Sequence, residues 1–471
     1  MYFQEGKAIY MKKRLTLQES IAITSMLFGM FFGAGNLIFP AKLGVDAGSN
    51  LVFAYLGMFV TAVGLPLLAV VALAMSRSSG VQNMADKIGG KYSTFFCTLL
   101  YLTIGPLFAI PRCASTSFSV GAVNLFPEGS KTLSSAIFSL AFFVIVLFFT
   151  LKPSGILTWI GRILNPIFLG FLAILIMATF IHPLGEVSAA LPSEAYSTPA
   201  KAFFAGFLEG YNTLDALAGL AFGIVVVNVV RRHGITKGDY VAANTAGAGV
   251  SSCLLMGVIY LFITLAAGQS NPILAGCSDG GAILGAISNY YFRTVGSVLM
   301  TAIVTLACIK TAIGLVTACS EAFTKLFPKG PSYPFWAVCF CAVSFAIANF
   351  GLSTIVAYCV PVLMFLYPLA ITLILLALFS NFYHKNRFVY VVTTAFTFVA
   401  AVFDLIKALA PMLPAGAVVN AMNGITAFAS GFLPFFDLGL GWLCPAILGF
   451  VIGTVVDLIY NKKHPVPVAN A

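Results

Sequence analysis

The residues best suited to binding a small molecule lie where two long apolar runs are interrupted by polar residues. In the first run, 20–45, the interruption is Gly33-Ala34-Gly35-Asn36. Glycines weaken a continuous helix, so we expect this helix to break at membrane depth. The freed backbone N–H groups favour a carboxylate, and the freed carbonyls favour a cation. The alternative is that Gly33 and Gly35 only let another helix pack closely.

A second interruption lies in the apolar run 202–230, which contains Glu209, Asn212, Thr213 and Asp215. Polar groups at membrane depth are costly, and they mark a functional site by default. Irregular segments at corresponding positions of two halves indicate an inverted-repeat secondary transporter with a binding site near the bilayer midplane. We therefore expect both interruptions to contribute to one site.

The composition is that of an integral membrane protein. Hydrophobic residues make up 60% of the 471 residues and charged residues only 8%, with a mean hydropathy of +1.00. Average soluble domains carry roughly 25% charged residues. At roughly 20 residues per span, the chain holds about a dozen helices and no soluble domain. The net charge of +10 comes from short basic clusters between apolar runs, which indicates membrane topology rather than nucleic-acid binding.

Apolar runs bounded by charges or by Pro and Gly clusters predict an all-α polytopic protein. We expect twelve spans, at 20–45, 50–75, 93–124, 133–151, 160–181, 202–230, 240–267, 296–326, 334–350, 353–379, 388–409 and 434–460. The expected organisation is a cytoplasmic segment 1–16, a first repeat 17–182, an extracellular loop 183–201, a second repeat 202–380, two peripheral spans within 381–461 and a cytoplasmic tail 462–471. Most basic residues then lie inside, so both termini are expected in the cytoplasm.

Several short motifs follow one another along the chain. They are GAGNLIFP at 33–40, GPLFAIPR at 105–112, AFGIV at 221–225, TACSE at 317–321 and PVLMFLYP at 361–368. Together they resemble the bacterial branched-chain amino acid:cation symporter family, over about residues 17–460. The resemblance implies a LeuT-type fold of five-plus-five inverted repeats. It also implies an importer of leucine, isoleucine and valine in the bacterial cytoplasmic (inner) membrane, usually coupled to sodium.

The resemblance implies a contact for each part of an amino acid. The backbone N–H groups of Ala34 and Gly35 would bind the carboxylate, and carbonyls of the unwound sixth span would bind the ammonium. The implied substrate-binding residues are Phe28, Gly33, Ala34, Gly35, Asn36, Phe108, Tyr211, Asn212, Thr213, Asp215 and Phe222. For each aromatic residue, ordinary core packing is the open alternative, because aromatic residues are abundant in this chain.

The resemblance also implies a sodium site between spans one and eight, formed by Gly29, Phe32, Ala307, Lys310 and Thr311. Family members commonly carry two adjacent hydroxyl residues where this chain has Lys310 and Thr311, and a protonated lysine cannot ligate sodium. We therefore expect the Lys310 ammonium to replace the ion, with coupling to protons or with none. The alternative is that Lys310 lies elsewhere and sodium still binds nearby.

The resemblance also implies a second cation site at Asn36 and Thr213, completed by Asn244. For Asn244 the alternative is a hydrogen bond between helices. The arginine at the end of the second motif, Arg112, is expected to hold a carboxylate or helix carbonyls in place, and the alternative is a direct contact with the substrate.

The rival functions are a carrier for another small neutral solute, a channel and a membrane enzyme. A channel needs repeated pore-lining charge or a carbonyl filter, and the sequence has neither pattern. The sequence also lacks a Gly-x-x-x-x-Gly-Lys-[Ser/Thr] nucleotide-binding loop, and its four histidines lie at span ends. We expect no enzymatic activity, no cofactor besides a coupling Na⁺ or H⁺, no nucleic-acid partner and no obligatory protein partner. The expected partners are the amino acid and the lipid bilayer.

Overall fold

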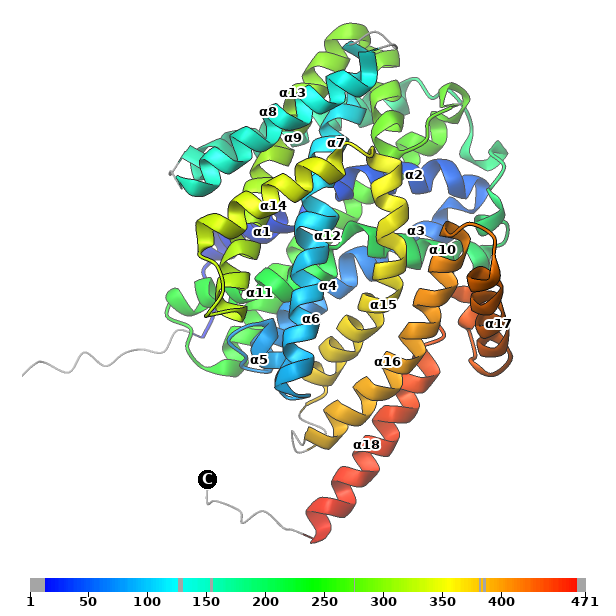
Figure 1. Ribbon diagram of the computed structural model, residues 1–471. Helices are drawn as coiled ribbons and strands as arrows, with labels where there is room; N and C mark the ends of the chain where they lie inside the picture. The colour runs from blue at the N-terminus through cyan, green and yellow to red at the C-terminus, as the bar shows by residue number, and fades with distance from the viewer. Residues whose placement is uncertain are drawn as a thin grey trace, which may run out of the picture.

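The computed structural model describes residues 13–125, 130–152, 156–274, 276–380, 383 and 387–463. Within these residues the regular structure is helical and contains no strand (Figure 1). In this described part, eight helices are long and apolar enough to cross a membrane, or nine when Pro199–Thr213 and Asp215–Arg232 count as one bent span. Three shorter apolar helices, Leu17–Phe31, Leu169–Ile181 and Tyr333–Ala348, account for the remaining expected spans. The predicted all-α membrane fold is confirmed.

The helices follow the expected order of spans. The first half contains α1 (Leu17–Phe31), α2 (Gly35–Ala47), α3 (Leu51–Phe59), α4 (Leu65–Met75), α5 (Val81–Ala85), α6 (Gly90–Leu102), α7 (Ala109–Val120), α8 (Lys131–Leu151) and α9 (Ile156–Ile181). The second half contains α10 (Pro199–Glu209), α11 (Asp215–Arg232), α12 (Gly238–Gln269), α13 (Gly280–Leu326), α14 (Tyr333–Ala348) and α15 (Leu352–Leu378). The remaining helices are α16 (Arg387–Leu409), α17 (Ala417–Phe432) and α18 (Leu443–Lys463).

The expected eighth span, 296–326, covers only the C-terminal part of the helix that contains it, α13. At 47 residues, α13 would measure roughly 70 Å if it were straight, far more than one bilayer crossing needs. It bends at Arg293, whose φ of 49° is incompatible with a continuous helix. Residues 280–292 therefore form a separate helical segment, which lies outside the expected span 296–326. This segment is helical because it buries Ile283, Leu284 and Ile287 on one face.

The predicted start of the last span is wrong. The span was expected from residue 434, but α18 begins at Leu443, and an unexpected helix, α17, precedes it. Between them the chain turns at Phe435 and Gly439, whose φ values are 63° and 72°. Residues with positive φ interrupt a right-handed helix, so the apolar run from residue 434 could not stay helical.

The two halves of the core interleave. α12 packs against α2, α11 against α4, α10 against α3 and α13 against α7. A Cβ atom added at Gly206 would collide with the Ala54 carbonyl, and one added at Gly57 would collide with the Phe203 carbonyl. α3 and α10 therefore touch backbone to backbone, as small residues allow in membrane helices. The interleaving brings the segment between α1 and α2 close to the segment between α10 and α11.

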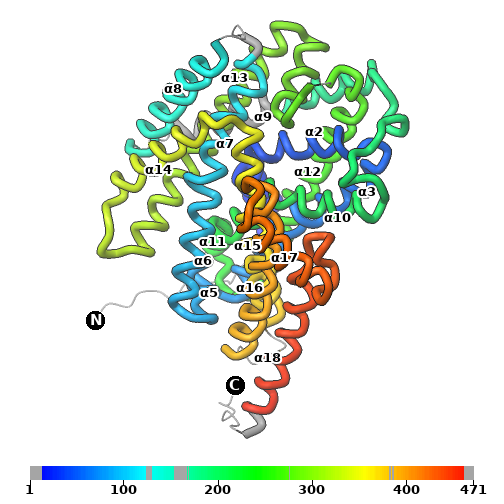
Figure 2. The backbone as a smooth tube through the Cα atoms, turned by 45° about the vertical axis from the view of Figure 1, so that its right-hand side comes forward, coloured from blue at the N-terminus to red at the C-terminus, as the bar shows by residue number. Residues whose placement is uncertain are grey.

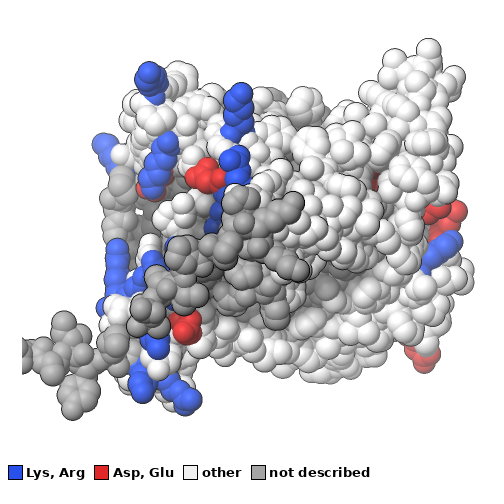
Figure 3. Space-filling model, turned by 90° about the horizontal axis from the view of Figure 1, so that it is seen from below, with Lys and Arg blue, Asp and Glu red and all other residues white. Residues whose placement is uncertain are grey.

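The C-terminal helices lie outside this core. α16 and α18 pack against each other on one side of the molecule, away from α8 and α14 (Figures 1 and 2). Viewed from below, Lys and Arg side chains gather on one side of the molecule, and the opposite side carries few of them (Figure 3). Such an asymmetry agrees with the positive-inside rule. The cytoplasmic placement of both termini stays a prediction.

Candidate functional site

The first span breaks at the predicted glycines. α1 ends at Phe31, and α2 begins at Gly35. The Gly33 N–H donates to Asn36 Oδ1 at 2.7 Å, and the Asn36 N–H donates to the Gly33 carbonyl at 3.2 Å. The Ala34 N–H has no acceptor among the described residues. As α2 has no preceding turn to accept its first N–H groups, its N-terminus offers a small positive potential to a ligand.

The sixth span breaks at the corresponding place. α10 ends at Glu209, a short turn follows over Gly210–Thr213, and α11 begins at Asp215. Leu214 has a φ of 66°, which ends the turn and lets the two helices meet at a bend of 45°. The predicted interruption of this span is therefore present.

The carbonyls at this second break are already occupied. Arg112 Nη1 donates to the Asn212 carbonyl at 2.5 Å, and Nη2 donates to the Thr213 carbonyl at 3.4 Å. Arg112 comes from α7, just after the kink at Gly105 and Pro106, where Gly105 has non-helical φ and ψ. The predicted contact of these carbonyls with the substrate ammonium stays a prediction, and Arg112 already donates to two of them. Of the roles considered for Arg112, the contact with helix carbonyls is present.

A buried polar network joins the two breaks. Asp215 Oδ2 accepts hydrogen bonds from Asn36 Nδ2 at 2.6 Å and from the Tyr260 hydroxyl at 3.1 Å. The Asn36 amide also donates to the Tyr260 hydroxyl. All three side chains are at most 3% exposed. Tyr260, on α12, was not predicted, because a single tyrosine in an apolar span gives no signal in the sequence.

A central cavity of about 50 Å³ lies between the breaks. Its lining includes Met30, Phe31, Gly33, Ala34, Gly35, Asn36, Ile104, Ala109, Arg112, Cys113, Thr213, Leu214, Asp215, Ala218, Phe222, Thr311 and Leu315. A volume of this size holds only a few water molecules, so side chains must move before an amino acid can enter. The lining carries one cation, Arg112, and one carboxyl group, Asp215, among mainly apolar side chains. This combination matches a zwitterion with an apolar side chain.

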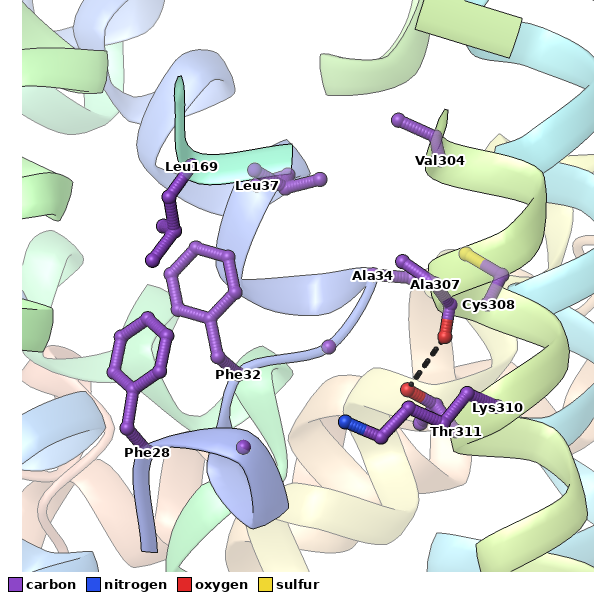
Figure 4. A pocket seen from close by; sticks show the side chains of 12 residues that line it. Phe28, Phe32, Ala34, Leu37, Leu169, Val304, Ala307, Cys308, Lys310 and Thr311 are labelled. Carbon is purple, nitrogen blue, oxygen red and sulfur yellow. Dashed lines mark hydrogen bonds between the residues drawn. The ribbon is translucent and has the colours of Figure 1, made fainter. Parts of the chain in front are cut away.

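A second pocket, of about 20 Å³, lies between α1 and α13 (Figure 4). All five residues of the expected sodium site line it, namely Gly29, Phe32, Ala307, Lys310 and Thr311. The Lys310 side chain extends from α13 toward α1, and the Thr311 hydroxyl donates to the Ala307 carbonyl at 3.0 Å (Figure 4). The structure therefore places a lysine side chain where the resemblance implied an ion.

Three of the expected aromatic residues lie outside the lining of the central cavity. Phe28 lines the pocket between α1 and α13. Phe108 lines a separate apolar pocket of about 360 Å³ that is bordered by α14 and α15. Tyr211 stacks on Tyr367 with 4.0 Å between ring centroids. Phe222 alone of the four lines the central cavity, so the packing alternative fits Tyr211 and a direct substrate contact fits Phe222.

Two polar residues also lie apart from their expected sites. The Asn212 side chain donates to Glu209 at 3.1 Å. Asn244 accepts from the Leu15 N–H at 2.9 Å and donates to the Lys13 carbonyl at 3.0 Å, which ties the segment before α1 to α12. Asn244 does not line the central cavity with Asn36, and its bonds reach the segment before α1 rather than another helix.

The described helices and the two facing breaks define a class by fold, the LeuT-type fold. Two solved structures share the fold. MHP1, a nucleobase-cation-symport-1 family transporter in a closed conformation with bromovinylhydantoin bound, matches with a TM-score of 0.53 and 14% identity, over 95% of this chain and 93% of that one. A variant of the Eremococcus coleocola manganese transporter matches with a TM-score of 0.58 and 12% identity, over 97% of this chain and 98% of that one.

Sequence comparisons define the family within this class. Residues 16–460 match the family described as "Branched-chain amino acid transport protein". The chain is 47% identical to the branched-chain amino acid permease BrnQ of Lactobacillus delbrueckii subsp. lactis, over 96% of this chain and all of that protein. It is 39% identical to the permease BraB of Bacillus subtilis, over 96% of this chain and 98% of the relative. The chain belongs to the branched-chain amino acid transport protein family.

Proposed function

We propose that this protein is a secondary active transporter that imports leucine, isoleucine and valine by alternating access. The observation that carries the proposal is the meeting of two broken helices at a buried cavity that holds one cation and one carboxyl group. The names of its relatives, which are branched-chain amino acid permeases, support the same substrate class. A family of multi-helix bacterial permeases also supports a location in the bacterial inner membrane. The gathering of basic side chains on one side supports the proposal that both termini lie in the cytoplasm (Figure 3).

The cavity suggests how the amino acid is oriented. Its carboxylate binds at the N-terminus of α2, where the Ala34 N–H lacks an acceptor among the described residues. Its ammonium binds near Asp215, because the neighbouring carbonyls of the second break are taken by Arg112. The aliphatic side chain lies against apolar lining residues such as Phe222 and Leu315. Each part of the substrate then meets a group of matching polarity.

The identity of the coupling ion is proposed to depend on Lys310. Its side chain lies in the pocket where sodium is expected in related carriers (Figure 4). A protonated amine in this pocket can donate to helix carbonyls and hold α1 to α13 without sodium. We propose that coupling to sodium is weak or absent, and that proton transfer at this amine supplies the coupling.

The second expected sodium site is also unfavourable for an ion. Asn36 Oδ1 accepts from the Gly33 N–H, and the Thr213 carbonyl accepts from Arg112. Sodium would have to compete with both donors for these oxygens. The substrate and the protein's own side chains are therefore proposed to be the main occupants of this region, with no cofactor and no catalytic chemistry.

Uptake into liposomes tests the proposal. Purified protein should exchange internal leucine for external labelled leucine, saturate with concentration and prefer L-leucine to D-leucine. Isoleucine and valine should compete, whereas a small neutral amino acid such as glycine should compete poorly. A channel would show neither exchange nor stereoselectivity, and a carrier for another solute would leave leucine uptake at background. Either result would refute the proposed function.

A further inference from the structure

Arg112 carries an unused hydrogen-bond donor inside the membrane domain. The side chain is only 5% exposed, and its guanidinium lies 5.0 Å from the centre of the Phe39 ring. Nη1 and Nη2 reach the Asn212 and Thr213 carbonyls, but Nε has no hydrogen-bond partner among the described residues. The contact with the carbonyls therefore uses only part of the donor set of this guanidinium.

The charge of Arg112 is also incompletely balanced. The two carbonyls are neutral acceptors, and within the described residues no carboxylate lies within ion-pair distance of the guanidinium. Asp215, the carboxyl group that shares the cavity, accepts instead from Asn36 and Tyr260. A buried donor or charge without a partner costs free energy, so such a group points to a ligand that supplies the missing acceptor.

The guanidinium lies against the first helix break. A Cβ atom added at Gly35 would lie 2.7 Å from Arg112 Nη2 and 3.2 Å from Cζ, so the missing side chain of Gly35 makes room for this group. Both residues line the central cavity. Nε and Nη2 lie on one edge of the planar guanidinium, and such an edge binds a carboxylate through two parallel hydrogen bonds.

We propose that Arg112 binds the carboxylate of the transported amino acid through its Nε and Nη2 edge. The carboxylate lies in the central cavity, beside this edge and next to the N-terminus of α2, and Nη1 keeps its bond to the Asn212 carbonyl. The inference rests on the proposed function, because it assigns a contact to the substrate of that site. Arg112 then serves as a fixed cation that selects substrates with a free carboxylate. If Arg112 only held the carbonyls of the second break, its Nε would have no hydrogen-bond acceptor among the described residues.

The test compares leucine with leucinamide, which keeps the ammonium and the side chain but lacks the carboxylate. Affinities are measured by calorimetry on purified protein for the unmodified chain and for Arg112→Gln and Arg112→Lys. The unmodified protein should prefer leucine by about 10- to 100-fold, as expected for hydrogen bonds to a charged group. Arg112→Gln should bind leucine and leucinamide with similar affinity. Arg112→Lys should keep part of the preference, because it retains the charge but loses the planar edge.

Lys407→Gln is the matched control. Lys407 lies on α16 and donates to the Phe436 carbonyl at 2.9 Å, so its replacement also removes a cation bound to a backbone carbonyl, away from the central cavity. This variant should keep the full preference for leucine. If Arg112→Gln loses affinity equally for leucine and leucinamide, Arg112 only holds the carbonyls of the second break in place, and the inference is overturned. Equal affinities in the unmodified protein would overturn it even if neither Arg112 variant folds, whereas absence of leucine binding would refute the proposed function itself.

Discussion

The two helix breaks face each other, but they leave different groups for a ligand. At the first break, the Ala34 N–H has no acceptor within the described part of the chain, and α2 starts with a glycine. At the second break, the carbonyls of Asn212 and Thr213 accept from Arg112. The first break is therefore open to an anion, whereas the second is closed by a cation that belongs to the protein.

This difference shows that repeated architecture does not imply repeated chemistry. The two halves supply similar breaks, yet side chains from helices other than the two broken spans lie at each break. Arg112 from α7 occupies the second break, and Lys310 from α13 lies beside the first (Figure 4). Both side chains end in a basic group, and Lys310 lies in the pocket where the resemblance implied a sodium ion. Four substitutions test whether the two breaks differ in this way.

The largest effect is expected at the first break. In Gly35→Leu, the new side chain must displace the Arg112 guanidinium and fill the space before α2, since even a Cβ atom would lie 2.7 Å from Nη2. Leucine binding should be undetectable by calorimetry, while gel filtration shows a monodisperse protein. The control is Gly314→Leu on α13, where nothing lies within 4 Å of the added atom. If a folded Gly35→Leu protein binds leucine with wild-type affinity, the first break is not part of the substrate site.

The next effect concerns Asp215, at the start of α11. Asp215→Asn keeps the size of the side chain and can still bond to Tyr260, but it removes the negative charge from the cavity. Leucine affinity should fall by about 10- to 100-fold, because the ammonium loses a charged acceptor. Asp437→Asn, at a carboxylate near Lys407 far along the chain, should leave uptake unchanged. Uptake by Asp215→Asn at the wild-type rate throughout a pH series would show that the charge is dispensable.

A smaller effect is expected beside the first break, at Lys310. Leucine uptake by the unmodified protein should change little when sodium replaces choline at constant pH and ionic strength. Lys310→Thr restores a hydroxyl ligand next to Thr311, so uptake should rise by about fivefold or more with sodium, the lower end of usual coupling between two ligands. Lys310→Met removes the amine without adding an oxygen and should stay unresponsive. Strong stimulation of leucine uptake by sodium in the unmodified protein would show that the protein is coupled to sodium and would refute the proposed role of Lys310.

The smallest effect is expected at Asn244, which lies outside both breaks. Asn244→Ala removes the bonds to the Leu15 N–H and the Lys13 carbonyl, which costs about 1 kcal/mol of stability per bond. Leucine affinity should stay within about twofold of the wild type, because the residue does not line the central cavity. Thermal unfolding and calorimetry on the same samples separate the two effects. A tenfold loss of leucine affinity at unchanged stability would instead place Asn244 in a binding site.

Much of the architecture could be predicted from local sequence. Long apolar runs must be helices in a bilayer, and glycines beside polar residues must interrupt them, so both breaks and most spans were located correctly. The errors arose where local signals are ambiguous. The segment 280–292 is helical because it packs on the core, and the run from 434 is interrupted by positive φ at Phe435 and Gly439. Neither packing nor backbone handedness can be read from apolar composition.

The sequence by itself determined the membrane class, the positions of the two breaks and the unusual lysine at residue 310, because each follows from residue type and spacing along one segment. Only the tertiary structure decided which groups meet. It joined Asn36, Asp215 and Tyr260 in one buried network, and it directed Arg112 onto the carbonyls of the second break. These contacts span more than 40 residues of chain in every case. They depend on helix crossing and kinking, which are set by packing between distant segments and leave no mark in the local sequence.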